Sequence, residues 1–115
     1  MTIQAADVVL IRMQFHQASG SKVRPALVLL DTGDQDFVAA PVTSQSRLSD
    51  FDFAINDWRA AGLNVPSSAR IHKLTVLAKT DIISRLGTVS DADRRRLAEF
   101  LCRIFCPGKE TTQLQ

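Results

Sequence analysis

The sequence has no tyrosine and a single tryptophan, and aromatic residues make up only 6% of its 115 residues. Grooves that bind proline-rich peptides are lined with aromatic side chains, so this scarcity argues against a peptide adaptor. The longest apolar runs are residues 8–11 and 25–30, far short of the roughly 20 residues that span a bilayer. The N-terminus also lacks the positive start and apolar core of a signal peptide, so we expect a cytoplasmic protein.

Several chemical signatures are missing as well. The chain has neither a G-x-x-x-x-G-K loop for nucleotide phosphates nor a G-x-S-x-G nucleophile elbow, which argues against nucleotide hydrolysis and acyl transfer. Its two cysteines, Cys102 and Cys106, lie four residues apart with no second ligand pair, so they fall short of a structural zinc site. In the cytoplasm both are expected to be reduced. We therefore expect no metal and no cofactor. The net charge of +2 permits a polyanionic partner without requiring one.

The residues that are present predict one small, mainly β domain over residues 1–108, followed by a C-terminal tail over residues 109–115. Apolar and β-branched runs predict strands at residues 7–13, 26–30, 37–42, 52–55, 69–77 and 83–89. The first of these hardly alternates between apolar and polar residues, so it should be buried on both faces. A helical turn closed by Gly62 is expected over residues 56–62.

One α-helix is predicted after the last strand. Ser90 fits an N-cap with Asp93 three residues later, and Pro107 with Gly108 ends the helix. The helical spacing forms an apolar stripe from five residues: Leu97, Phe100, Leu101, Ile104 and Phe105. Five or six short strands and one covering helix predict a strongly curved antiparallel sheet or a partly open barrel.

Two segments couple an apolar strand to a hydrogen-bonding side chain at its end. Arg24 precedes the run at residues 25–30, and Thr43 follows the run at residues 37–42. An arginine and a hydroxyl can thus be held on neighbouring strand ends. The polar segment at residues 14–23 has the composition of a mobile loop, and such loops often carry functional sites.

A second pair of candidates lies in the predicted strand at residues 69–77. Arg70 and His72 are two residues apart, so strand alternation would point both side chains to the same face. Lys22 and Lys73 also flank the apolar strands, where single cations can converge on one phosphate. Trp58 is expected to anchor a small satellite core rather than to stack on a base, although proteins that bind single strands do use aromatic residues in that way.

An ordered set of short motifs resembles the MazF/PemK family of bacterial toxins across about residues 6 to 105. The motifs are Asp7-Val8-Val9, Arg24-Pro25-Ala26-Leu27-Val28-Leu29, Pro41-Val42-Thr43-Ser44, Gly62-Leu63, and Pro66-Ser67 before Arg70. The resemblance implies an SH3-like barrel, a homodimer, metal-independent cleavage of single-stranded RNA (mRNA) and inhibition by a cognate antitoxin.

The resemblance also implies roles for single residues. Arg24 corresponds to the catalytic arginine of the family, Thr43 to the threonine that contacts the scissile phosphate, and Arg70 to a second arginine. Contacts to the RNA are expected from Lys22, Ser44, Gln45 and Lys73. The chain departs from the family at two positions: Ala6 replaces the glycine before the first-strand aspartate, and His72 replaces an acidic residue.

RNA cleavage through the 2′-hydroxyl needs a base, an acid and donors for the charge that develops on phosphorus. Arg24 and Thr43 suit the last role, because guanidinium grips phosphate in a fixed fork. His72 is the conventional proton-transfer candidate, with a purely structural role as its alternative. Two other functions remain open: a non-catalytic toxin that poisons a protein target such as DNA gyrase, or a degenerate member retained for partner binding.

Overall fold

The computed structural model describes residues 2–14, 21–45 and 49–107, which form seven β-strands, two 3-10 turns and one α-helix. The strands are β1 (Asp7–Gln14), β2 (Ser21–Asp31), β3 (Asp36–Thr43), β4 (Asp52–Ile55), β5 (Ser67–Arg70), β6 (Thr75–Ala78) and β7 (Ile82–Thr88). The 3-10 turns η1 (Ile71–Lys73) and η2 (Lys79–Asp81) flank β6, and α1 (Asp91–Phe105) follows β7. Within the described ranges, no helix has the length and apolar character needed to cross a membrane.

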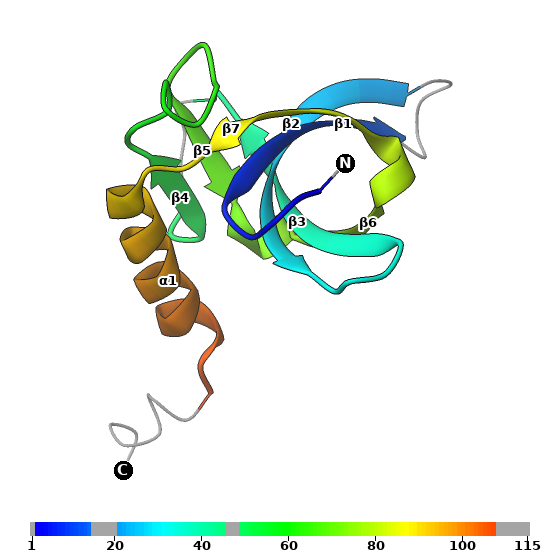
Figure 1. The fold of residues 1–115 in the computed structure, drawn as a ribbon. Coiled ribbons are helices and arrows are strands. Elements are labelled where there is room, and N and C mark those ends of the chain that lie inside the picture. Colours follow the sequence, from blue (N-terminus) through cyan, green and yellow to red (C-terminus); the bar gives the residue numbers. More distant parts are fainter. Residues whose placement is uncertain (1, 15–20, 46–48, 108–115) are drawn as a thin grey trace.

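The strands form one strongly curved antiparallel sheet in the order β4-β5-β3-β2-β1-β7, with β6 beside the first half of β3. Because β3 pairs with β2 on one edge and with β6 and β5 on the other, the sheet bends into the ring seen in Figure 1. The path ends at β4 and β7, so in the described part of the chain the barrel is open. This confirms the predicted class, a mainly β, SH3-like barrel with a C-terminal helix.

The core divides into two clusters on the two faces of the curved sheet. Val8 belongs to the cluster that includes Phe53 and Leu97, whereas its neighbour Val9 belongs to the cluster around Phe37. Both valines are 0% exposed, which confirms that β1 is buried on both faces, as its lack of alternation predicted. The first cluster lies between the sheet and α1, and the second fills the ring.

The second strand is longer than predicted. It begins at Ser21 rather than Ala26, so Pro25 lies inside β2 and not at its start. The ladder with β3 begins only at Ala26, while Pro25 lies opposite Leu10 of β1. At Pro25 the strand therefore has one partner, which tolerates a residue without an N–H. The predicted loop over residues 14–23 is thus partly strand, and residues 15–20 lie outside the described residues.

The prediction of one strand over residues 69–77 is wrong. The structure divides this segment into β5, η1 and β6. Both strands pair with β3, but a straight continuation of β5 would place His72 opposite Ala39, where Thr75 lies instead. The offset of three residues equals the length of η1, which lets the chain turn the corner of the barrel. Alternation alone gives no sign of such a corner. The division of this segment into two strands brings the total to seven strands instead of five or six.

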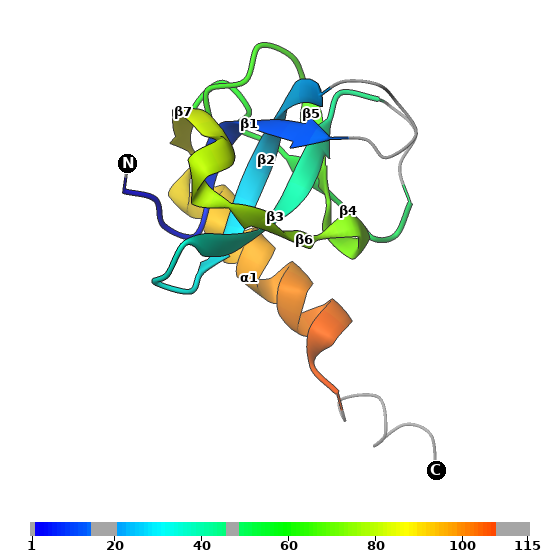
Figure 2. The same ribbon diagram turned by 90° about the vertical axis from the view of Figure 1, so that its right-hand side faces the viewer.

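The helix begins and ends where the sequence predicted. Ser90 caps it by accepting a hydrogen bond from the backbone N–H of Asp93 at 3.1 Å. The buried Asp93 carboxylate accepts from the backbone N–H of Asp57 at 2.8 Å and from Arg96 at 2.7 Å. Figure 2 shows the C-terminal half of α1 extending beyond the strands. Phe105, predicted in the apolar stripe, is 49% exposed for that reason. The predicted tail over residues 109–115 lies outside the described residues.

Ala6 has a left-handed backbone with φ of 79° and is 3% exposed. This conformation is costly for alanine, by about 1–2 kcal/mol. Replacing Ala6 with glycine removes that cost but also removes a buried methyl, about 0.8 kcal/mol, and frees the unfolded chain, about 0.4–1 kcal/mol. We therefore expect Ala6→Gly to leave the free energy of unfolding within about 0.5 kcal/mol of wild type.

The matched control is Ala39→Gly, because Ala39 is fully buried in the extended backbone of β3. At this position glycine removes a buried methyl and frees the unfolded chain, but it relieves no backbone strain. The free energy of unfolding should therefore fall by more than about 1 kcal/mol. Urea unfolding of both variants measures the difference. Equal losses at the two positions would show that Ala6 is not strained.

Candidate functional site

Arg24 and Thr43 lie on the neighbouring strands β2 and β3. The ladder between these strands ends at Ala26 opposite Pro41, so each of the two residues lies two positions beyond the last pair. Both residues are half-buried and line one cavity of about 530 Å³. The structure thus brings together the two side chains that the sequence placed on neighbouring strand ends.

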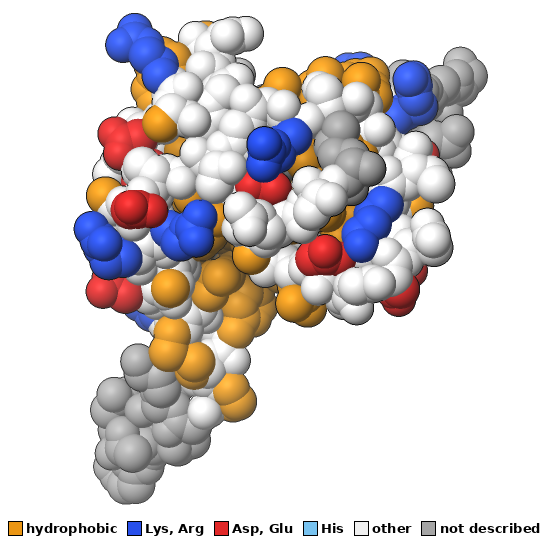
Figure 3. Space-filling view, viewed as in Figure 1, with side chains coloured by type: hydrophobic (Ala, Val, Ile, Leu, Met, Phe, Trp, Pro, Cys, Tyr) orange, Lys and Arg blue, Asp and Glu red, His pale blue; other side chains and the backbone are white. Residues whose placement is uncertain are grey.

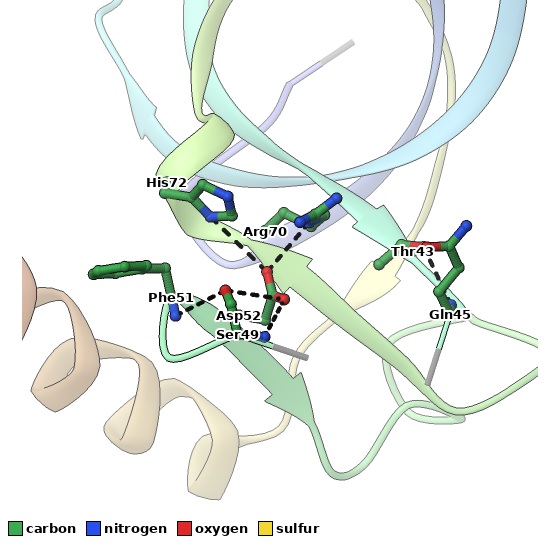
Figure 4. Close-up of polar contacts among 7 residues, drawn as sticks. All are labelled: Thr43, Gln45, Ser49, Phe51, Asp52, Arg70 and His72. Carbon is green, nitrogen blue, oxygen red and sulfur yellow. Dashed lines mark hydrogen bonds and ion pairs between the residues drawn. The ribbon is translucent and has the colours of Figure 1, made fainter. Parts of the chain in front are cut away.

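Ser44, Gln45 and residues 62–65 complete much of the wall of this cavity. The backbone N–H of Gln45 donates to the hydroxyl oxygen of Thr43 at 3.2 Å, as Figure 4 shows. Because the oxygen accepts this bond, the hydroxyl hydrogen can be donated to a ligand. Among the described lining residues, Arg24 is the sole charged one. The cavity therefore suits an anion with several acceptor oxygens.

Arg70 and His72 gather around a different residue, the buried Asp52. Arg70 Nε lies 3.3 Å from Asp52 Oδ1, and His72 Nδ1 lies 4.0 Å from the same oxygen. Asp52 pairs with Arg70 across β4 and β5. The two basic side chains do share a location, but the predicted reason, strand alternation, is wrong because His72 lies in η1.

The cluster around Asp52 adjoins the cavity without lining it. Thr43 pairs with Ser68 in β5, and Arg70 is two residues further, so Thr43 and Arg70 lie on one face of the sheet. In Figure 4, Arg70 lies between His72 and Thr43. A ligand longer than the cavity can therefore reach from Arg24 to Arg70.

Two further residues fix the cluster. Ser49 donates its backbone N–H to Asp52 Oδ2 at 2.9 Å, and the ring of Phe51 lies 5.7 Å from that of His72. No sequence signal marked Asp52 for this role, because its only visible property was its place in a short alternating strand. The pairing of β4 with β5 gives Asp52 its partner.

Lys22 and Lys73 are exposed, and neither belongs to the described lining of the cavity. On the face drawn in Figure 3, lysine and arginine side chains are interspersed with acidic ones and with an apolar area beside α1. This face therefore carries no broad positive field. The described residues also contain no group of three or more side chains that could hold a metal ion.

Asp52 carries the clearest electrostatic shift at this site. Burial opposes its charged form, but hydrogen bonds from Ser49 and the guanidinium of Arg70 outweigh burial and lower the pKa of Asp52 from 3.8. A carboxyl with a lowered pKa in the folded state stabilises the fold above its unfolded pKa. That contribution is lost as the pH falls through the folded pKa, so it disappears in the acid range below about pH 4.

We expect Asp52→Asn to lower the free energy of unfolding at neutral pH by about 1–3 kcal/mol, because Arg70 loses a buried charged acceptor. The variant should also lose stability less steeply than wild type between about pH 4 and pH 2. Urea unfolding across this range measures both effects. If the dependence of stability on pH is unchanged, the loss of stability in acid comes from Asp31 and Asp34. Lys79 lowers the pKa of Asp31, and Thr32 lowers the pKa of Asp34.

Comparisons with known proteins agree with this architecture. Residues 4–105 match the model of a family described as PemK-like, MazF-like toxins of type II toxin–antitoxin systems. Comparison with curated protein sequences finds no significant match. Since the family model covers most of the chain, the chain belongs to the PemK-like, MazF-like toxin family.

Solved structures give the same fold at low identity. The MazF of a MazE–MazF complex from Deinococcus radiodurans has a TM-score of 0.69 at 21% identity, with 90% of this chain and 94% of that chain covered. The Mycobacterium tuberculosis toxin MazF-mt6 has a TM-score of 0.66 at 20% identity, with 85% and 96% covered. A mycobacterial endoribonuclease in complex with its cognate antitoxin has a TM-score of 0.68 at 14% identity, with 92% and 97% covered.

Proposed function

We propose that this protein is a toxin endoribonuclease that cleaves single-stranded RNA without a metal ion. The 2′-oxygen attacks the adjacent phosphorus, the bond to the 5′-oxygen breaks, and a 2′,3′-cyclic phosphate remains on the upstream fragment. The observation that carries the proposal is the cavity whose described lining has Arg24 as its sole charged residue and also includes Thr43. Membership of the toxin family supports it.

The charges in the cavity match the needs of the transition state. Negative charge grows on the non-bridging oxygens as the 2′-oxygen attacks, and a guanidinium with a neighbouring hydroxyl donor stabilises it. Arginine is always protonated near neutral pH, so Arg24 serves best as a fixed positive donor. Arg70 lies on the same sheet face as Thr43 and stabilises the negative charge of the scissile phosphate or of the adjacent phosphate.

Proton transfer is assigned to His72, because an imidazole can both accept and donate a proton. Its Nδ1 lies 4.0 Å from Asp52 Oδ1, which is an ion-pair distance for a protonated ring and is too long for a hydrogen bond. The ring lies outside the described lining of the cavity, so this role requires the reacting 2′- or 5′-oxygen of the bound RNA to come within hydrogen-bond distance of the ring. If His72→Ala cuts RNA as fast as wild type, this role is excluded and the histidine is structural.

The decisive experiment incubates the purified protein with a long single-stranded RNA in EDTA, beside the Arg24→Ala variant. We expect fragments with 2′,3′-cyclic phosphate ends from wild type and intact RNA from the variant. Such a result establishes metal-independent cleavage that depends on Arg24. Intact RNA with both proteins would instead point to a toxin that binds a protein target such as DNA gyrase.

We also propose a cognate antitoxin and a homodimer as the partners of this cytoplasmic toxin. The antitoxin is supported by the similar structures that hold one, a MazE–MazF complex and an endoribonuclease bound to its cognate antitoxin. Lys22, Ser44, Gln45 and Lys73 are proposed to contact the RNA. Of these four, Ser44 and Gln45 line the cavity, whereas the two lysines are exposed and lie outside its described lining.

A further inference from the structure

A second hollow lies directly beside the cavity that contains Arg24. It has a volume of about 350 Å³ and shares three wall residues with the first cavity, namely Ser44, Gln45 and Ser67. A chain that passes from one hollow to the other would cross only this wall. The two hollows are therefore placed to hold successive parts of one extended ligand.

The chemistry of the second hollow differs from that of the first. None of its described lining residues is charged; Trp58, Ile55 and Pro66 supply apolar surface, and the Asn56 and Gln45 side chains supply amides. A phosphate would find no cation here. A nucleobase has an apolar face for contact with an aromatic ring and an edge of donors and acceptors that amides can bind.

The segment that carries Asn56 and Trp58 is held in place before any ligand arrives. Its central residue, Asp57, donates its backbone N–H to Asp93 at 2.8 Å and accepts from the Ser90 hydroxyl at 2.6 Å, which ties the segment to the start of α1. The guanidinium of Arg59 lies 4.7 Å from the centre of the Trp58 ring. A fixed segment spends little binding energy on ordering itself.

We propose that the second hollow binds one unstacked base of single-stranded RNA, next to the phosphate held by Arg24 and Thr43. The base contacts Trp58, and Asn56 and Gln45 read its edge. The inference rests on the proposed function, and it deepens that function by assigning sequence preference to the second hollow. It also gives Trp58, which packs against the first core cluster rather than anchoring the predicted satellite core, a second role at the surface.

Trp58 is itself the reporter for this proposal, because the chain has one tryptophan and no tyrosine. Its fluorescence is titrated with short 2′-O-methyl oligoribonucleotides, in which the blocked 2′-oxygen prevents cleavage, and with an abasic oligomer of the same length. We expect the base-containing oligomers to quench Trp58 and to bind at least about fivefold more tightly than the abasic one. Equal binding and equal quenching by the abasic oligomer would overturn the proposal.

Variants separate base reading from folding. Asn56 is exposed, so Asn56→Ala should fold normally. It should lower the affinity for the base-containing oligomers about tenfold and leave the affinity for the abasic oligomer unchanged. Gln35→Ala removes an exposed amide between β2 and β3 that lines neither hollow, so it should change the affinity for neither kind of oligomer. Trp58→Phe keeps the core filled and should retain base binding better than Trp58→Leu. Identical affinities for wild type and Asn56→Ala would contradict the assignment.

The same variants are then tested on long RNA in EDTA. We expect Asn56→Ala to cut a wider set of sequences than wild type while producing the same cyclic phosphate ends. RNA that is cut with unchanged preference, together with unquenched Trp58, would overturn the base site and leave the proposed function intact. Uncut RNA together with a quenched Trp58 would overturn the nuclease and support the second hollow as a base site.

Discussion

Replacing Arg24 with lysine is expected to lower the rate of RNA cleavage by at least about 100-fold while the fold is retained. Lysine keeps the positive charge but presents a single ammonium point, whereas guanidinium offers parallel donors to two phosphate oxygens. Arg24 lines the same cavity as Thr43, where we propose that such a fork binds the phosphate. Single-turnover cleavage in EDTA measures the loss, and urea unfolding verifies that stability changes by less than about 1 kcal/mol.

The matched control for this substitution is Arg95→Lys. Arg95 is exposed on α1 and belongs to none of the described cavity lining, so the same chemical change should leave the rate unaltered. If Arg24→Lys retained the wild-type rate, a point charge would suffice at this position. The site would then act by attracting the phosphate and not by gripping it.

The sequence predicts that Arg24 and Thr43 lie close together because each borders an apolar run, and the two residues do line one cavity. The two apolar runs belong to the neighbouring strands β2 and β3, although β2 begins before Arg24. The buried first strand and the cap at Ser90 are also predicted. Each depends on residues close in the chain.

The features that the sequence did not reveal depend on contacts between distant segments. Asp52 meets Arg70 only because β4 pairs with β5, and His72 joins them only because η1 turns the chain at the barrel corner. The second hollow is built from three separate segments, around residues 44, 56 and 67. Alternation and spacing describe one segment at a time, so they place Trp58 in a core but give no sign of the hollow beside it.

The loop that contributes Trp58 to the second hollow packs closely against β7 through Gly62 and Gly87. Gly62 has φ of +85°, and a Cβ added there would lie 2.1 Å from the carbonyl oxygen of Leu86 in β7. On the facing strand, a Cβ added at Gly87 would lie 2.7 Å from the carbonyl carbon of Ala61. The backbones of the loop and of β7 therefore pack directly against each other, which only residues without a side chain permit.

Gly62→Ala is accordingly expected to lower the free energy of unfolding by about 3 kcal/mol or more, since overpacking adds to the strain of a left-handed alanine. Gly33→Ala is the control, because Gly33 has the same φ of +85° but nothing within 4 Å of an added Cβ. It should lose only about 1–2 kcal/mol. Urea unfolding of both variants separates the cost of the steric contact with β7 from the cost of the left-handed backbone. Equal losses of stability would mean that β7 shifts to accommodate the added methyl without cost. Because Gly62 also lines the Arg24 cavity, the displaced loop should weaken oligonucleotide binding even where Gly62→Ala remains folded, an effect that Gly33→Ala lacks.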